Sequence, residues 1–577
     1  MSASKLQESS EVRIAHSLHT DEEEFVARRR ETVFQSLQKL NIHCSQDEVP
    51  NIALLGSGGG QRAMVGLLGS LDQLDKAGLL DCILYLSGVS GSTWCMASLY
   101  QEPDWSTKLE TVKDKIIERL SGPAVSWGDA FDKLKKYYKK DFFSLTDVWA
   151  AMAITEYVKE IDEVTLRDQW DHLSKDPFPI YTVIDTQSKK EKEKGGDKDD
   201  PWFEISPLEA GYSLTGAFVE TSSFGSKFDR GSKKNPQDGM DMLYLQALCG
   251  SALADRSEIF KYLWQKIKDL FKNLTPLIES DTFEEMMKEP KAPPAYKCYQ
   301  VLIDLVEVNL AVLNGKDYSA LVQTIKTTLE GEMFLKSARI HFAELGGGTN
   351  HLIIPGEKTL AEKQAANFDV KKFTEHVLKD LSCLFSSDSF DLVWSICKCL
   401  TWWIWGRNYN FLHKMKNEAV PAALLEGETR DYEDAGLLLN SPYFSVLREE
   451  RNIDLIISLD FSDGDPFKTV NTTQKLCEEL KIPFPGVNRA RENPKNPEGF
   501  YVFKGTNTPT VIHIPLFNVI NCKGNIAAWR NRYATFQGSY SRKMITDLME
   551  VAGKNISDNR EKLLEQIQAV IDQKRHE

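Results

Sequence analysis

The stretch "LGSGGGQRAMVG", from Leu55 to Gly66, decides the fold. It begins at the last residue of the apolar run "NIALL", and its own end, "RAMVG", is the start of the longer run "RAMVGLLGSLDQLDKAGLL". The sequence therefore predicts a buried strand, a tight glycine loop and a helix. Further along, "DCILYLSGVSGSTWCMASLY" repeats this order with a second strand, a sharp turn and another helix. Short strand–helix–strand–helix connections indicate an α/β sheet that is at least partly parallel.

A glycine loop between a strand and a helix is typical of an anion site, and the anion has to be identified. Gly58, Gly60 and Ala63 fit the dinucleotide pattern G-x-G-x-x-G/A. That site also needs an acidic residue at the end of the second strand, whereas Asp81 precedes this strand. A P-loop is excluded because no Gly-Lys-Ser/Thr follows the glycines. We therefore expect the loop N–H groups to bind an anion other than a nucleotide phosphate.

The end of the second strand supplies a candidate nucleophile. "GVSGS", residues 88–92, places Ser90 between glycines just before a helix, which is the nucleophile-elbow arrangement. The match to G-x-S-x-G is partial, because Ser92 occupies the fifth position. Loops after parallel strands open on one edge of a sheet, so the glycine loop and Ser90 are predicted neighbours. Acyl transfer needs this combination of a nucleophile with N–H donors for the oxyanion.

A serine nucleophile also needs a base. The order serine, acid, histidine of α/β-hydrolases could be completed by His513. His513 lies within "TVIHIPLF", however, a strand pattern that favours a structural histidine over one on a loop.

Composition narrows the class of protein. Of 577 residues 42% are hydrophobic, enough for a sizeable core, and the net charge of −14 argues against a nucleic-acid binder. The ten cysteines form no C-x-x-C pair and the N-terminus "MSASKLQESSEV" lacks an apolar signal region, so we expect free thiols, a reducing compartment and no zinc. The most apolar run, 392–406, is interrupted by Lys398 and is too short for a spanning helix. Any membrane contact is therefore expected to be peripheral.

The chain divides into three predicted parts. Residues 1–45 form an N-terminal segment with an amphipathic helix, capped by Thr20 and Glu23. Residues 46–577 form an α/β domain whose later strands are "NIDLIISLDFS" and "TPTVIHIPLF". A helical cap or lid is expected to interrupt it at about 225–430, and the charged stretch 188–201 is expected to be a surface loop.

Several motifs together resemble one family. "GSGGGQRAM", "LSGVSGSTW", "DAGLLLNSPY" and "LIISLDFS" are similar to the cytosolic (group IV) phospholipase A2 family, which is related to patatin-like lipid acyl hydrolases. "WFEISPLEAG", "FGSKF", "GRNYNFL" and "IPFP" add to the resemblance, which extends from about residue 30 to 540. The gamma type, which lacks a calcium-binding C2 domain, is the most similar. The resemblance implies a central mixed β-sheet flanked by helices, with a helical cap or lid insertion.

The resemblance also implies site residues. The family uses a Ser/Asp dyad, which places the nucleophile at Ser90 and the base at Asp434. Gly59 and Gly60 match the oxyanion-hole positions with Gly58 beside them, and Arg62 matches an arginine that holds the substrate phosphate. A carboxylate can accept the serine proton if burial raises its pKa toward neutrality.

Three further features stay open at this level. "DFSDGDPF", from Asp460 to Phe467, lacks the glycine and glutamate of an EF-hand, so no metal is expected. Arg448 and Arg451 are expected to be exposed, either as solvated basic residues or in contact with lipid headgroups. The tryptophans of 392–406 belong either to a core helix or to a lipid-facing surface.

The sequence therefore predicts a calcium-independent serine phospholipase with lysophospholipase and transacylase activity and no cofactor. Its expected partners are phospholipid membranes and lysophospholipids, and its expected location is the cytoplasm with peripheral association with intracellular membranes. Two alternatives remain: a Ser–His–Asp esterase using His513, and a catalytically silent lipid-binding scaffold.

Overall fold

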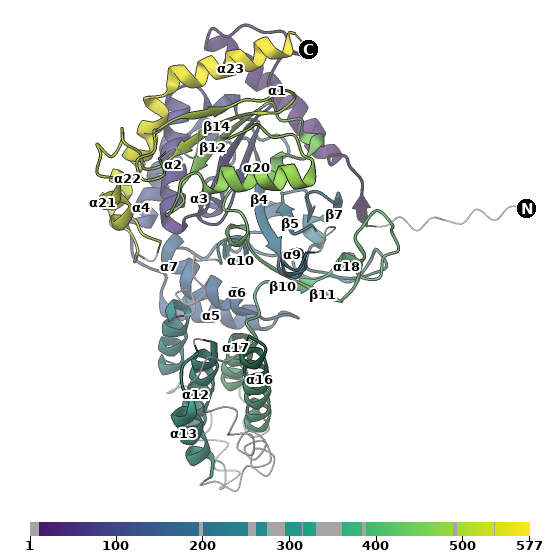
Figure 1. Ribbon diagram of the computed structural model, residues 1–577, viewed down its shortest axis with the longest axis vertical. Helices are drawn as coiled ribbons and strands as arrows, with labels where there is room; N and C mark the ends of the chain where they lie inside the picture. The colour runs from purple at the N-terminus through teal and green to yellow at the C-terminus, as the bar shows by residue number, and fades with distance from the viewer. Residues whose placement is uncertain are drawn as a thin grey trace, which may run out of the picture. The chain divides into compact units, whose positions relative to one another are not determined.

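The computed structural model describes residues 11–195, 200–251, 261–273, 295–313, 315–330, 360–382, 388–487, 493–535 and 537–576. The chain forms two compact units. Unit 1 comprises Met1–Ala130, Trp149–Ile259 and Gly406–Glu577 and contains the β-sheet (Figure 1). Unit 2 comprises Phe131–Val148 and Phe260–Trp405 and is helical where it is described.

The predicted central mixed sheet is confirmed in unit 1. Ten of its strands follow the order β1-β7-β6-β5-β4-β3-β2-β12-β14-β13, and β11 pairs with both β4 and β10. The strands are β1 Val12–Ile14, β2 Ile52–Gly56, β3 Tyr85–Gly88, β4 Phe178–Asp185, β5 Trp202–Ile205, β6 Glu209–Tyr212, β7 Ala217–Glu220, β10 Arg407–Tyr409, β11 Thr429–Asp434, β12 Leu455–Asp460, β13 Tyr501–Phe503 and β14 Thr510–Pro515. A separate hairpin pairs β8 Lys227–Asp229 with β9 Ser232–Asn235.

The central strands β14, β12, β2, β3 and β4 are parallel to one another. Strands β2, β3, β4, β12 and β14 are buried along their whole lengths, which explains their continuous apolar runs. Their register is level at the carboxyl end, where Pro515 pairs with Asp460, Leu459 with Gly56, and Gly56 with Gly88. The loops after β2, β3, β12 and β14 therefore leave the sheet at one edge.

Helices flank this sheet (Figure 1). A buried apolar cluster joins residues of β2, β3, β4 and β12 to Phe25 of α1, Phe444 of α19 and Val470 of α20. Helix α2 packs against α3, α4 and α22, and a Cβ on Gly69 would lie 2.6 Å from the Met549 carbonyl oxygen. These helices of unit 1 are α1 Thr20–Lys39, α2 Gly60–Lys76, α3 Gly91–Leu99, α4 Leu109–Leu120, α19 Tyr443–Val446, α20 Lys468–Leu480 and α22 Arg542–Ser557.

Unit 1 also contains shorter helices and a final long one: α7 Thr155–Val158, α8 Leu166–Gln169, α9 Thr186–Glu193, α10 Met242–Cys249, α18 Ala422–Leu425, α21 Ile526–Arg532 and α23 Arg560–Lys574. A π-helical segment, Ala150–Ile154, precedes α7. The described helices of unit 2 include 261–273 together with α12 Ala295–Leu313, α13 Ser319–Glu330, α16 Leu360–Ser382 and α17 Asp388–Trp402. Helices α5 Trp127–Tyr138 and α6 Leu145–Trp149 run across the division between the units.

Local details differ from the sequence predictions at three places. Helix α1 begins at Thr20, but its N-cap is His19, whose Nδ1 accepts a hydrogen bond from the Asp21 N–H, so the predicted Thr20/Glu23 capping box is wrong. Residues 186–193 form α9 because the Asp185 side chain caps it by accepting from the Ser188 N–H, so the charged stretch is a loop only in part. Unit 2 has different bounds from the predicted insertion at about 225–430, since β8, β9, α10, β10 and α18 belong to unit 1 and Phe131–Val148 belongs to unit 2.

Unit 2 contains the tryptophan-rich stretch. Trp394 and Trp402 lie on α17 and Trp403 follows it; all three are half-buried, and Trp405 is buried. The Trp394 indole donates to the Leu378 carbonyl of α16 at 2.7 Å. In the described part of the chain, none of the helices is both long and apolar enough to span a bilayer.

Candidate active site

A cavity of about 430 Å³ opens at the carboxyl edge of the parallel strands. The structure brings all six sequence-predicted site residues to its wall. They are Gly58, Gly59, Gly60, Arg62, Ser90 and Asp434. The rest of the wall comes from the loop after Asp434, the loop after β12, the start of α20, and Thr535.

Ser90 occupies the turn between β3 and α3 with φ 52° and ψ −122°. A positive φ is strained for a residue with a side chain and is typical of a nucleophile elbow. The next residue has to be glycine, because a Cβ on Gly91 would lie 1.9 Å from the Gly60 carbonyl oxygen. The elbow therefore packs directly against the glycine loop. Ser90 itself is 5% exposed, at the wall of the cavity.

Asp434 ends β11, and the strand register brings it near Ser90. Strand β5 lies along one flank of β4 at residues 181–184, so β3 and β11 share the other flank. Gly88 pairs with Tyr181 and Asp434 pairs with Val183. Two residues along a strand span about 7 Å, so the end of β3 and the Asp434 backbone are neighbours.

The Asp434 carboxylate is held in place by its own turn. Its Oδ1 accepts a hydrogen bond from the Gly436 N–H at 2.8 Å, and its backbone N–H donates to the Ser251 Oγ at 3.3 Å. Asp434 is fully buried in the protein. Burial, and then the charge of Asp434, raise the pKa of the neighbouring Cys249 thiol. The site therefore combines a buried carboxylate with a strained serine at one cavity.

The glycine loop has N–H groups of two kinds. The Gly58 N–H donates to the Asn440 carbonyl at 3.2 Å. The N–H groups of Gly59 and Gly60 have no acceptor among the residues that the structure describes. These two N–H groups are therefore available to a substrate oxygen, whereas Gly58 is committed to the architecture of the loop.

Asn440 joins the glycine loop to the aspartate turn, and it was not among the site residues predicted from the sequence. Its Nδ2 donates to the Gly58 carbonyl at 3.1 Å and to the Ser462 Oγ at 2.9 Å. A Cβ on Gly58 would lie 2.3 Å from the Asn440 Oδ1, and one on Gly436 would lie 2.9 Å from it. Asn440 is six residues after Asp434 in "DAGLLLNSPY", and only this proximity in sequence could have suggested its role.

Arg62 is buried at 1% exposure rather than displayed on the helix surface. Its Nε donates to the Phe461 carbonyl and its Nη1 to the Tyr533 carbonyl, both at 2.7 Å. A weaker ion pair joins it to Asp463 at 3.8 Å. Arg62 thus fixes the loop after β12 and the end of α21 against the glycine loop. If Arg62 binds a substrate phosphate as predicted, it does so at the cavity wall, where these two carbonyl hydrogen bonds already hold its guanidinium in place.

His513 is not one of the residues that line this cavity. It sits inside β14, paired with Ser458 of β12, and its Nε2 is 2.7 Å from the Pro466 carbonyl oxygen. Burial lowers the pKa of His513, although the nearby Asp460 acts in the opposite direction. The structure therefore supports the structural interpretation of His513 and gives no support to a Ser–His–Asp arrangement.

Arg448 and Arg451 are also placed differently from the prediction, because both are 3% exposed. Arg451 donates to Glu22 at 2.9 Å and to Glu204 at 2.7 Å, and Arg448 pairs with Glu204. The prediction of exposed basic residues was wrong because it could not foresee two buried carboxylates on distant elements. These arginines belong to the interior of unit 1 and do not face a lipid surface.

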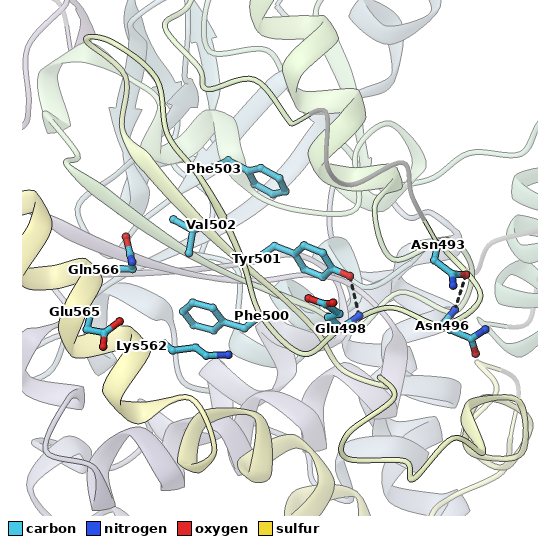
Figure 2. Close-up of a pocket in the computed structure, with 10 residues that line it drawn as sticks. All are labelled: Asn493, Asn496, Glu498, Phe500, Tyr501, Val502, Phe503, Lys562, Glu565 and Gln566. Carbon is cyan, nitrogen blue, oxygen red and sulfur yellow. Dashed lines mark hydrogen bonds between the residues drawn. The ribbon is translucent and has the colours of Figure 1, made fainter.

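A second hollow, of about 660 Å³, lies between the edge strand β13 and α23 (Figure 2). Phe500 and Lys562 face each other there, with the Lys562 Nζ 5.6 Å from the ring centre. None of the six predicted site residues lines it. Within the described residues, no group of three or more histidine, cysteine, aspartate or glutamate side chains is arranged to hold a metal ion.

The chain is similar to known phospholipases over nearly its whole length. The family model of the lysophospholipase catalytic domain matches residues 52–291. Cytosolic phospholipase A2 gamma of Mus musculus is 31% identical over 97% of this chain and 93% of the relative. The Homo sapiens protein of the same name is also 31% identical, over 97% of each chain. The chain belongs to the cytosolic phospholipase A2 family.

Solved structures agree with this fold. Human GIVD cytosolic phospholipase A2 matches with a TM-score of 0.65 and 21% identity over 98% of this chain and 66% of that chain. A second structure of that human protein, with a TM-score of 0.61 and 18% identity, is a complex with a methyl gamma-linolenyl fluorophosphonate inhibitor and terbium chloride. Family membership makes this protein a phospholipase A2 or lysophospholipase, a hydrolase of lipid metabolism.

Proposed function

We propose that the protein hydrolyses fatty-acyl esters of glycerophospholipids through an acyl-enzyme on Ser90, with Asp434 as the general base. The observation that carries this proposal is the common cavity of a strained serine, a buried carboxylate and two N–H groups that have no acceptor among the described residues. Gly59 and Gly60 would form the oxyanion hole, and Gly58 would hold the loop in shape.

The proposed reaction has two halves. The Ser90 Oγ attacks the ester carbonyl carbon while its proton passes to the Asp434 carboxylate, and the carbonyl oxygen becomes the oxyanion bound by the Gly59 and Gly60 N–H groups. Collapse breaks the ester C–O bond, and the departing lysophospholipid oxygen takes the proton from Asp434. Water then attacks the acyl-enzyme, gives a proton to Asp434 and releases the fatty acid, and Ser90 recovers its proton.

The acyl-enzyme explains the other proposed activities. If a lysophospholipid hydroxyl replaces water in the second half, the product is a new phospholipid and the protein acts as a transacylase. A lysophospholipid that enters in the first half is deacylated. None of these steps requires calcium, so we propose a calcium-independent enzyme of the cytoplasm that associates peripherally with intracellular membranes. Activation by micromolar calcium in a chelator titration would contradict the calcium part of this proposal.

Active-site labelling tests the dyad directly. A fluorophosphonate probe should modify wild-type protein on Ser90, as located by peptide mass spectrometry, and should not modify Ser90→Ala. Asp434→Asn should label at least a hundredfold more slowly, because removal of the base slows serine attack on the order of 10²–10⁴-fold. Unlabelled Ser90 in folded protein would favour the silent lipid-binding scaffold, and equal labelling of Asp434→Asn would eliminate Asp434 as base.

Arg62 is proposed to bind the substrate phosphate through the edge of its guanidinium that faces the cavity. Arg62→Lys keeps a positive charge but loses the planar fork that serves two carbonyls at once. If the phosphate contact exists, the variant should lose kcat/KM for a phospholipid more than for an uncharged ester of the same acyl chain. An equal loss on both substrates would assign Arg62 a purely architectural role.

A further inference from the structure

An adjacent pair of apolar side chains is exposed on the loop that follows β14. Val519 is 36% and Ile520 is 53% exposed, although the residues on either side, Asn518 and Asn521, are buried. Large exposed aliphatic side chains are common singly, but two neighbours on one tight loop are a local apolar surface. Neither side chain lines the candidate active-site cavity.

The loop is held rigidly, so the exposure of this pair is built into the fold. The Asn518 Nδ2 donates to the Asn555 Oδ1 at 2.7 Å, and its Oδ1 accepts from the N–H groups of Ile520 and Asn521 at 3.1 Å. The Asn521 Nδ2 donates to the Val551 carbonyl on α22 at 3.1 Å. The Val519 N–H is bonded to the Pro497 carbonyl at 3.0 Å, which fixes the other side of the loop.

The surrounding sequence has an unusual charge. Between Glu498 and Asp547 the chain has no acidic residue and six basic ones, in a protein of net charge −14. Arg532 and Lys543 pair with Asp547, and Arg542 pairs with Glu118. The other basic residues of this segment are Lys504, Lys523 and Arg530. Lys523 is exposed three residues after Ile520, and Arg530 is half-buried on α21.

The loop leaves the sheet at the edge where the active-site cavity opens. Pro515 is level with Asp460, and the neighbouring strands end beside it at Gly56 and Gly88. Three strand spacings, about 15 Å, separate β14 from β3, which leads to Ser90. The same segment continues through α21 to Thr535, which lines the cavity. The apolar pair and the nucleophile are thus presented at one edge of unit 1.

We propose that Val519 and Ile520, flanked by Lys523 and Arg530, form a contact surface for anionic phospholipid bilayers. The aliphatic side chains would enter the interface and the two cations would meet lipid phosphates, the arrangement expected of a peripheral binder. This inference rests on the proposed action on membrane phospholipids and adds the surface that brings the cavity to them. The absence of acidic residues between Glu498 and Asp547 favours an anionic partner, and the exposed aliphatic pair Val519 and Ile520 favours a bilayer as that partner.

Vesicle binding tests the surface without catalysis. In a Ser90→Ala background, Val519→Glu/Ile520→Glu should reduce cosedimentation with phosphatidylcholine–phosphatidylserine vesicles by about tenfold or more, since it replaces two inserting groups by two anions. The matched control is Leu480→Glu, which adds an anion at a 37% exposed leucine, the last residue of α20. Lys523→Gln should weaken binding only when phosphatidylserine is present.

The outcomes separate this inference from the proposed function. With Ser90 restored, the double variant should lose activity on vesicles but keep activity on a monomeric lysophospholipid below its micelle concentration. Unchanged vesicle binding by the double variant, or an equal loss with Leu480→Glu, would overturn the surface. A wild-type protein inactive on both substrates would overturn the proposed function instead, because binding is measured on the Ser90→Ala protein.

Discussion

Two buried polar regions lie beside β4, and the second of them also includes Tyr85 of β3. On one flank, β3 and β11 lead to Ser90 and Asp434 at the cavity. On the other, Glu204 of β5 pairs across the strand with Thr182 and binds both Arg448 and Arg451. Glu22 of α1 completes this second region by accepting from Arg451 and from the Tyr85 hydroxyl.

The difference between the regions is how their polar groups are satisfied. In the arginine region each charge meets an opposite charge, and the two arginines outweigh the effect of burial so that the pKa of Glu204 is lowered. At the cavity a carboxylate is buried beside a serine held at a strained φ, and the N–H groups of Gly59 and Gly60 have no acceptor in the part of the chain that the structure describes. A buried charge that is paired indicates a structural role. Backbone strain and hydrogen-bonding groups without a partner indicate a catalytic role.

The largest expected effect separates activity from stability. Asp434→Asn should lower kcat on phospholipid on the order of 10²–10⁴-fold, because the neutral amide cannot accept the serine proton. Its unfolding midpoint should stay close to wild type, because the amide oxygen can still accept from the Gly436 N–H. Kinetics on vesicles and urea denaturation provide the two measurements. A variant that lost stability rather than activity would remove the distinction between the regions.

The arginine region should show the opposite pattern. Arg451→Met leaves Glu22 and Glu204 buried without this partner and should cost about 3–5 kcal/mol of unfolding free energy. Its matched control is Arg542→Met, which breaks an exposed pair with Glu118 and should cost about 0–1 kcal/mol. Activity per folded molecule of Arg451→Met should remain near wild type. A large loss of kcat in the folded fraction would extend the catalytic region into the arginine region.

A smaller effect probes how tightly the glycine loop is held. Gly58→Ala places a Cβ 2.3 Å from the Asn440 Oδ1 and 3.0 Å from the Ser90 Cβ, so the loop or the amide has to shift. We expect a loss of kcat of about 10²-fold, comparable to the removal of one oxyanion donor. Gly464 lines the same cavity but a Cβ there would meet nothing within 4 Å, so Gly464→Ala should be neutral. Equal kinetics of the two variants would show that the loop tolerates displacement.

The smallest expected effect concerns His513, whose pKa is lowered by burial. The folded state disfavours protonation of His513, while the unfolded chain takes up a proton below about pH 6.5. Above that pH, protonation of His513 therefore does not reduce the free energy of unfolding. As the pH falls below it, the free energy of unfolding decreases by up to about 1.4 kcal/mol per pH unit. His513→Gln should flatten this acid limb in chemical denaturation and keep activity on phospholipid. A loss of activity in the folded variant would revive a histidine-dependent esterase.

Features that depend on residues close together in the sequence could be predicted, whereas features that depend on contacts between distant residues could not. The strands and helices around Gly58 and Ser90 could be predicted because a strand, a tight turn and a helix are encoded within a dozen residues. The cap of α1 could not, since His19 and Thr20 are adjacent candidates and the backbone geometry decides between them. Arg451 was predicted to be a surface residue because its partners, Glu22 and Glu204, lie 429 and 247 positions away in the sequence.

The sequence by itself determined an α/β fold, a serine on a strand-to-helix turn and a glycine loop beside it, because each is a local pattern of apolar runs and glycines. Only the tertiary structure decided which N–H groups of that loop are available. It also decided that Asn440 ties the loop to the aspartate turn and that Arg62 holds two distant loops. Those contacts join residues hundreds of positions apart, and they exist only after the sheet brings the strand ends to one edge.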